Sequence, residues 1–152
     1  MTTPEETLAG LGLSVPEVVP PVAAYVPFVR SGGHVFTAGQ LPLREGVLVA
    51  TGKVGAEVSQ ETATECARQC ALNAIAAVKA EVGELSLVKR VVKVVVFVAS
   101  DPSFTAQPAV ANGASELLGI AFGEAGVHAR SAVGVSVLPL DAPVEVEIIV
   151  EV

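Results

Sequence analysis

The 152-residue chain has no tryptophan, one tyrosine and five phenylalanines, so its core must be built mainly from aliphatic side chains. Hydrophobic residues make up 51% of the sequence and charged residues only 16%. This balance favours a folded domain over a disordered chain, because enough apolar surface is available to offset the entropy lost on ordering. The length predicts one domain, residues 1–152, with residues 1–20 as an N-terminal extension. The large apolar share also indicates surface buried in a homo-oligomer.

Basic residues are scarce, since the net charge is −7 and no run of Lys or Arg occurs. Nucleic-acid-binding proteins usually carry a basic surface, because neutralised phosphates supply much of the affinity. We therefore expect no nucleic-acid partner. No apolar stretch reaches the roughly 18 residues of a membrane span, since Arg90 and Lys93 interrupt the best candidate. The acidic start MTTPEETLAG lacks the apolar core of a signal peptide. These absences predict a cytoplasmic protein with no membrane partner.

Only two cysteines are present, Cys66 and Cys70, four residues apart on a predicted helix. Cβ atoms at that spacing lie about 5–6 Å apart, beyond the span of about 3.5–4.5 Å that a disulfide bridges. A metal site would need further Cys or His ligands nearby, and none follow. We interpret both cysteines as small core residues on one helical stripe, and we expect no metal site.

The order of the predicted elements is β-β-β-α-β-α-β-β, which is typical of an α+β domain with one mixed sheet and two helices on one face. Ser59 is a suitable N-cap for the longer helix and Gly83 a suitable C-terminal stop. The run 88–99 is apolar at both parities, which indicates an interior strand covered on both faces. The predicted strands are 25–30, 34–38, 48–51, 88–99, 130–138 and 144–152, and the predicted helices are 59–82 and 109–123.

Arg130 opens a predicted strand in which the residues of its own parity are small, namely Ala132, Gly134 and Ser136. Small neighbours leave room beside the guanidinium, whose planar donors can hold a carboxylate through two parallel hydrogen bonds. The alternative is a surface arginine paired with a glutamate, a commoner arrangement worth about 0–1 kcal/mol. The pattern alone favours the surface pair.

Two further features invite a chemical interpretation. Glu145 and Glu147 alternate on the last strand, and paired carboxylates perform acid–base chemistry, although alternating glutamates more often line a solvated face. His128 lies near Arg130 and could act as a base, but a lone histidine is more often structural. No nucleophile elbow or phosphate-binding loop occurs.

Several segments, taken in order, resemble the RidA (YjgF) family over roughly residues 20–152. The C-terminal part is the most specific, because both residues and spacing resemble the family signature. The matching segments are Tyr25, Ala38-Gly39-Gln40-Leu41-Pro42, Gly52-Lys53-Val54-Gly55, Val91 to Val98, Asp101, Phe104, Ala129-Arg130-Ser131, Leu138-Pro139 and Val144-Glu145-Val146-Glu147.

The resemblance implies a chorismate-mutase-like fold, assembled as a trimeric barrel with substrate clefts between subunits. It implies that Arg130 binds a substrate carboxylate and that Glu145 handles water or protons. Tyr25, Ala38, Gly39 and Asn112 would line the same cleft. Ala38 and Ala132 stand where many members have Ser and Cys, and His128 stands where Pro is usual, which marks a divergent branch.

Well-understood members hydrolyse 2-aminoacrylate or 2-iminobutyrate to keto acids and ammonia without a cofactor. The resemblance therefore implies deamination of small enamine or imine acids. A trimer that binds small carboxylates without chemistry is an alternative that uses the same arginine. Ribonuclease activity, ascribed to some relatives, fits poorly with the net charge of −7.

Overall fold

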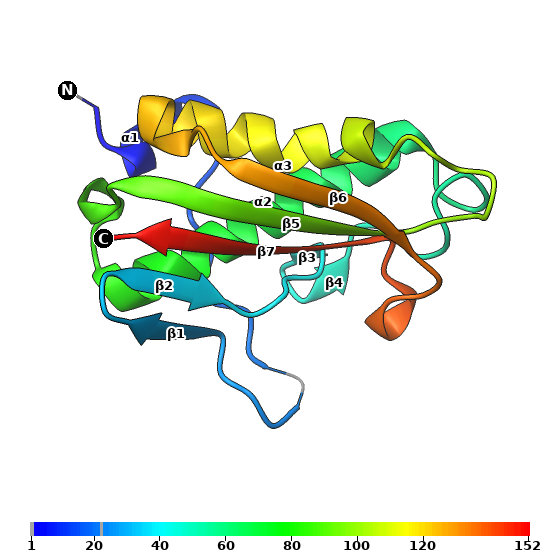
Figure 1. Ribbon diagram of the computed structural model, residues 1–152, viewed down its shortest axis with the longest axis horizontal. Coiled ribbons are helices and arrows are strands. Elements are labelled where there is room, and N and C mark those ends of the chain that lie inside the picture. Colours follow the sequence, from blue (N-terminus) through cyan, green and yellow to red (C-terminus); the bar gives the residue numbers. More distant parts are fainter. Residues whose placement is uncertain (1, 22) are drawn as a thin grey trace.

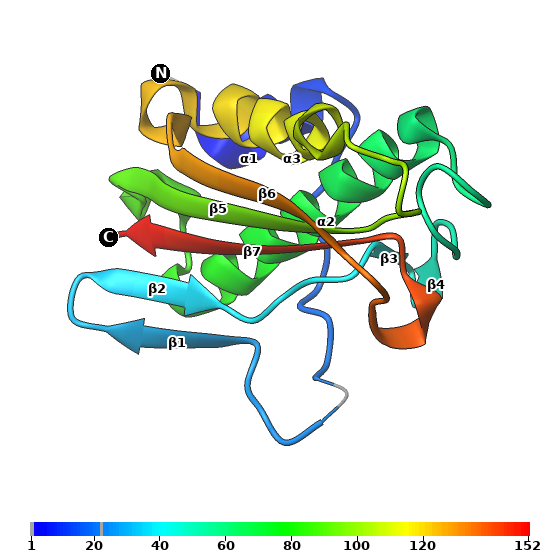
Figure 2. The ribbon, with the colours of Figure 1, turned by 45° about the vertical axis from the view of Figure 1, so that its right-hand side comes forward.

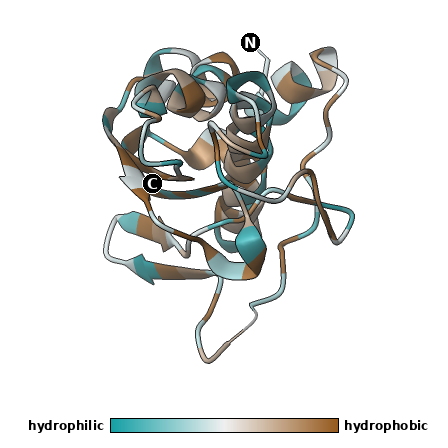
Figure 3. Cartoon of the chain, turned by 90° about the vertical axis from the view of Figure 1, so that its right-hand side faces the viewer, coloured by the Kyte–Doolittle hydropathy of each residue, from teal (hydrophilic) through white to brown (hydrophobic). Residues whose placement is uncertain are grey.

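The computed structural model describes residues 2–21 and 23–152. Its centre is a mixed five-stranded sheet in the order β1-β2-β7-β5-β6, and α2 and α3 cover one of its faces (Figures 1 and 2). The strands are β1 (Phe28–Ser31), β2 (His34–Thr37), β5 (Arg90–Ala99), β6 (Ala129–Val135) and β7 (Val144–Glu151), and the helices are α1 (Pro4–Gly10), α2 (Gln60–Val82) and α3 (Gln107–Phe122). The predicted α+β class with a mixed sheet is confirmed. The end-on view in Figure 3 shows the layer of helices beside the sheet, with apolar residues in both.

Strand β5 lies inside the sheet, antiparallel to β7 and parallel to β6, with α3 as the crossover between β5 and β6. A β-bulge between Val91 and Lys93 shifts the alternation of its side chains. Val94 and Val96 are fully buried under the helices, whereas Phe97 on the other face is only half-buried. The apolar run had predicted a strand covered on both faces. Within one chain, β5 is covered on one face only.

The first two strands form an antiparallel hairpin that turns at Gly32-Gly33, with Gly32 in the left-handed region at φ 58°. The predicted strand 25–30 begins later, at Phe28, because Pro27 has no N–H to contribute to a sheet. The predicted strand 48–51 is wrong. Val47–Leu48 (β4) pairs with Leu43–Arg44 (β3) in a small separate hairpin. Its turn, at Glu45 and Gly46, takes positive φ at both residues and closes the pair locally.

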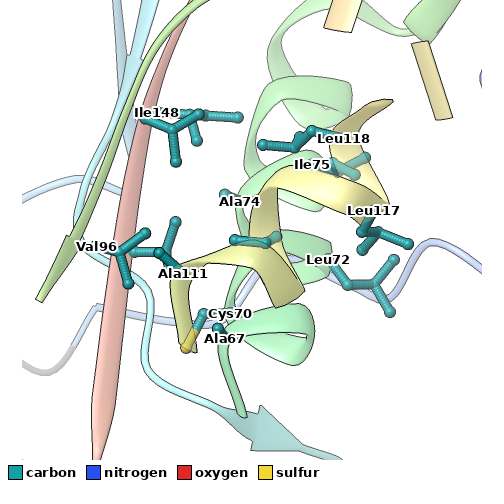
Figure 4. Packing of buried hydrophobic residues seen from close by; sticks show 14 of the residues in the cluster. Ala67, Cys70, Leu72, Ala74, Ile75, Val96, Ala111, Leu117, Leu118 and Ile148 are labelled. Atoms are coloured by element: carbon teal, nitrogen blue, oxygen red, sulfur yellow. The ribbon is translucent and has the colours of Figure 1, made fainter. Parts of the chain in front are cut away.

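Helix α2 has the boundaries that its end residues predict. The Ser59 hydroxyl accepts a hydrogen bond from the Thr62 amide at 3.1 Å, and Gly83 ends the helix at φ 84°. Its buried stripe packs against α3 and the sheet (Figure 4). Cys66 and Cys70 are free and buried in this stripe, which confirms the interpretation as core residues. Burial raises the pKa of the Cys66 thiol to about 11, so it stays protonated at neutral pH.

Helices α2 and α3 pack backbone against backbone at Gly113. A Cβ at this position would lie 3.0 Å from the carbonyl carbon of Thr64, and the Thr64 oxygen is nearer still. Six residues along the same helix, Gly119 has nothing within 4 Å of a hypothetical Cβ. The helix crossing therefore depends on the absence of a side chain at Gly113.

The N-terminal segment packs onto the rest of the domain. Leu8 of α1 is fully buried in the main core. The Glu5 carboxylate accepts hydrogen bonds from Lys79 Nζ at 2.6 Å and from the Leu85 amide at 3.2 Å. No helix in the described part of the chain is long and apolar enough to span a membrane.

Candidate functional site

Arg130 lies near the start of the edge strand β6, and its side chain reaches α3. The guanidinium Nη1 donates to Asn112 Oδ1 at 2.8 Å and to Ser115 Oγ at 3.1 Å. Nη2 donates to the Pro108 carbonyl at 3.4 Å. Within residues 2–21 and 23–152, Arg130 forms no ion pair with a carboxylate, so the surface-pair interpretation is not realised in this chain.

Strand register places Arg130 on the face of the sheet that the helices cover. It pairs with Val94 of β5, and Val94 pairs with Ile148 of β7. Residues directly opposite one another on neighbouring strands point to the same face. Val94 and Ile148 both belong to the core under the helices. The arginine is thus held at the margin between the sheet and α3.

His128 completes a polar group around the arginine. Its Nε2 lies 2.8 Å from Ser115 Oγ, and its Nδ1 lies 2.6 Å from the Gly126 carbonyl oxygen. His128 therefore has a partner that the sequence did not reveal. Arg130, Asn112, Ser115 and His128 form what we call the arginine half-site.

Glu145 lies on the opposite, uncovered face of the sheet. It pairs with Phe97 of β5, which pairs with the exposed Val133 of β6. Burial of the half-buried carboxyl group, with a further contribution from the charge of Glu147, raises the pKa of Glu145 above its ordinary value. A carboxylate of raised pKa accepts a proton more readily near neutral pH, as a general base must.

Gly39 packs directly against the Glu145 side chain. A Cβ at position 39 would lie 2.8 Å from Cδ of Glu145, so only glycine fits beside the carboxylate as it is placed. Hydrogen bonds from the Gln40 amide to the Val146 carbonyl, at 2.8 Å, and from the Val146 amide to the Gln40 carbonyl, at 3.0 Å, fix this approach.

Tyr25 and Gly39 line a small surface pocket of about 30 Å³. Ala38, beside it, is half-buried, and its amide donates to the Pro27 carbonyl at 2.8 Å. We call Tyr25, Ala38, Gly39 and Glu145 the glutamate half-site. Its pocket is far smaller than the roughly 300–1,000 Å³ of a usual ligand site. The other lining residues are Val19, Pro20, Pro27, Gln40, Leu41 and Leu43.

The residues singled out in the sequence are therefore brought together as two groups and not as one. Asn112 meets Arg130, and Gly39 meets Glu145, but the sheet separates the two half-sites within a chain. Ser115 was missed by sequence reasoning. Its one signal is its spacing of three from Asn112, which places both on one helical face.

Larger hollows lie elsewhere, and one of about 370 Å³ between α2 and α3 is lined by Glu65, Arg68 and Glu116. Another hollow, of about 490 Å³, lies between α1 and the end of α3 and has no ionisable side chain in its lining. We place the candidate site at the converging polar groups, because volume alone supplies no recognition. The described residues contain no group of three or more His, Cys, Asp or Glu side chains placed to share a metal ion.

Comparison with known proteins assigns the family. Residues 5–152 match the family described as "YjgF/chorismate mutase-like, putative endoribonuclease". The chain belongs to this family, which confirms the resemblance found in the sequence. It is 46% identical over 145 residues to Protein TCP17 of Trypanosoma cruzi, covering 95% of this chain and 91% of that protein.

Solved structures agree with the assignment. A structure from Shewanella oneidensis MR-1, described as a putative endoribonuclease, is 34% identical with a TM-score of 0.97, covering 99% of this chain and all of the other. Escherichia coli TdcF, solved with bound serine, is 27% identical with a TM-score of 0.65, covering 90% of this chain and 94% of TdcF.

Proposed function

We propose that this protein hydrolyses small enamine or imine acids to keto acids and ammonia, in clefts between the subunits of a homotrimer. One observation carries the proposal: Arg130 and Glu145 lie on opposite faces of the sheet within a chain. A neighbouring copy is needed to bring an arginine half-site to a glutamate half-site. Closed homo-oligomers repeat such a contact symmetrically, so each added subunit completes another cleft.

The uncovered face of the sheet supports this assembly. Phe36, 42% exposed, Val29 and Val133 lie on it with no helix above them. β6 is also an edge strand with an unpaired side. Exposed apolar faces and open edges favour association, and proteins usually cover them. A second and third copy of this chain would cover both.

The arginine half-site suits a carboxylate. Arg130 keeps its Nε–H and one Nη2 hydrogen without an acceptor in the described part of the chain. Two such donors on one guanidinium can bind a carboxylate through two charge-assisted hydrogen bonds of defined geometry. TdcF was solved with serine, a small molecule that carries a carboxylate, which supports a small carboxylic acid as the ligand class here.

The glutamate half-site suits the hydrolysis step. On the protonated imine, Glu145 takes a proton from water as the water oxygen bonds to the imine carbon, which yields a neutral carbinolamine. Glu145 returns this proton to the nitrogen and then accepts the hydroxyl proton as the C–N bond breaks, so that the carbonyl forms and ammonia leaves. The raised pKa of Glu145 favours these proton transfers near neutral pH. Holding the substrate in place supplies much of the remaining rate.

The test is ammonia release from imines generated in situ by an amino-acid oxidase or a dehydratase. Arg130→Ala should lower kcat/KM by at least about 100-fold, because a bidentate charged pair is lost. Arg68→Ala, which removes an exposed arginine of α2, is the matched control and should retain activity. Equal activity of the Arg130→Ala and native proteins would overturn the assignment.

Two further measurements would favour the alternative functions, a binding protein or a ribonuclease. Thermal stabilisation by 2-ketobutyrate without ammonia release indicates a binding protein that uses the same arginine. Cleavage of RNA with strongly salt-dependent affinity indicates the ribonuclease named in the family description. The net charge of −7 and the scarcity of basic residues argue against the latter.

A further inference from the structure

The hydrogen bonds of the arginine half-site run in one direction. The Gly126 carbonyl can only accept, so the His128 Nδ1 at 2.6 Å must carry the hydrogen between them. In the neutral imidazole, Nε2 is then an acceptor, and it takes the Ser115 hydroxyl hydrogen at 2.8 Å. The Ser115 oxygen therefore presents only lone pairs to Arg130 Nη1, 3.1 Å away.

This order fixes which edge of the guanidinium is available to a ligand. Nη1 has two hydrogens, and its two acceptors are Ser115 Oγ and Asn112 Oδ1. The carbonyl of Pro108, at the start of the same helix, accepts from Nη2 at 3.4 Å. The donors that remain are Nε–H and the second Nη2 hydrogen. Because all three acceptors belong to α3, the helix sets the orientation of the guanidinium before a ligand binds.

We propose that His128 and Ser115 are positioning residues. His128, acting through Ser115, sets the orientation of the Arg130 guanidinium and thereby the affinity of the site for a planar carboxylate. The ligand class rests on the proposed function; the orientation of Arg130 does not. A chain of hydrogen bonds that point the same way holds its members more firmly than isolated pairs do.

A plainer role for His128 is to hold the turn at Gly126 through Nδ1. Gly126 packs closely, since a Cβ there would lie 3.0 Å from Gly119 Cα. Two conservative variants separate the roles. In His128→Gln the side-chain oxygen is as many bonds from the backbone as Nε2 and can accept from Ser115. In His128→Asn the amide nitrogen matches Nδ1 and can bond Gly126, but Ser115 loses its acceptor.

Nuclear magnetic resonance of the arginine side chain tests the orientation without a ligand. We expect slow rotation about the Nε–Cζ bond of Arg130 in the native protein and in His128→Gln, with separate Nη resonances. Rotation should be several-fold faster in Ser115→Ala, His128→Asn and His128→Leu. The same rotation rate in all five proteins, or fast rotation in His128→Gln and slow rotation in His128→Asn, would overturn the inference.

Calorimetric titration with 2-ketobutyrate then measures the consequence. Kd should rise about three- to tenfold in Ser115→Ala and His128→Asn, as expected for one hydrogen bond, and should recover mostly in His128→Gln. Binding by the native protein that Arg130→Ala abolishes, with unchanged Kd in all the Ser115 and His128 variants, would overturn this inference alone. Absence of native binding, together with His128-dependent rotation, would overturn the carboxylate ligand and uphold the positioning.

Discussion

Gly39 and Glu145 are in van der Waals contact, and a Cβ at position 39 would lie 2.8 Å from Cδ of Glu145. The paired hydrogen bonds between Gln40 and Val146 hold the segment at Gly39 against strand β7 at this spacing. The position of the carboxylate is therefore set by the lack of a side chain on the neighbouring segment. This contact makes the glutamate half-site sensitive to a single methyl group.

Replacing Gly39 by Ala should displace the Glu145 carboxylate and leave the fold intact. The clash falls on the flexible end of a side chain, which can rotate away. A displacement of about 1 Å at a reacting group can cost roughly 100-fold in rate, so we expect imine hydrolysis to fall about 10- to 100-fold. Ammonia release and the melting temperature would be measured together. Gly33→Ala, where the nearest atom is 3.6 Å away, is the control; equal activity in both variants contradicts the prediction.

Glu145→Gln should stabilise the protein at neutral pH. Because the pKa of Glu145 is raised in the folded state, the native protein binds more protons than the unfolded chain does. Native stability therefore falls as pH rises from the ordinary pKa of 4.5 through the raised value. Glutamine removes this loss, so Tm should exceed the native value by a few degrees at about pH 7 and match it near pH 4. A difference in Tm that is the same at both pH values would contradict this account.

Two glycines of α3 should respond oppositely to alanine. Gly113→Ala forces a methyl group against the backbone of Thr64, so it should destabilise the protein by about 1–3 kcal/mol. Gly119→Ala meets nothing within 4 Å and should stabilise it by about 0.5–1 kcal/mol through helix propensity. Urea unfolding at one fixed protein concentration measures both changes, since association also contributes to stability. A Gly113→Ala variant as stable as the native protein or more stable would show that the crossing has room to relax, and a destabilised Gly119→Ala variant would contradict the second expectation.

Phe36→Glu should dissociate the proposed trimer. It places a charge on the uncovered face, where burial without a partner is costly. Light scattering should show the mass falling from three chains to one chain of 15.4 kDa. Ile120→Glu, at an exposed position of α3, should leave the mass unchanged. A trimer that survives Phe36→Glu would place the interface on another surface.

Local signals predicted most of the fold. Ser59 and Gly83 marked the ends of α2 because capping depends on the nearest few residues. The small β3–β4 hairpin was mistaken for part of the main sheet, because a short apolar run does not say which partner it will find. The bulge between Val91 and Lys93 was also invisible, and it helps to explain why β5 is apolar at both parities.

The candidate site was predicted as a set of residues but not as an arrangement. The strand patterns singled out Arg130 and Glu145, the resemblance implied their roles, and Asn112 proved to contact Arg130. That the two charged residues face opposite sides follows only from strand register across β5, which no local pattern records. Beyond its spacing of three from Asn112, Ser115 carries no distinguishing signal, since a serine inside a helix usually faces solvent or bonds its own backbone.

The separation of Arg130 from Glu145 by the sheet has a genetic consequence. Under the proposed assembly each cleft is formed by two subunits, one supplying Arg130 and the other Glu145. Chains with different defects should therefore complement one another. An equimolar mixture of Arg130→Ala and Glu145→Gln chains, unfolded and reassembled together, should regain about a quarter of native activity. In about half of the clefts the first subunit carries the native arginine, and in about half of those the second carries the native glutamate. Simple mixing of the folded variants should regain none until subunits exchange. A cell that makes both variant chains would then keep an activity that neither chain supplies alone.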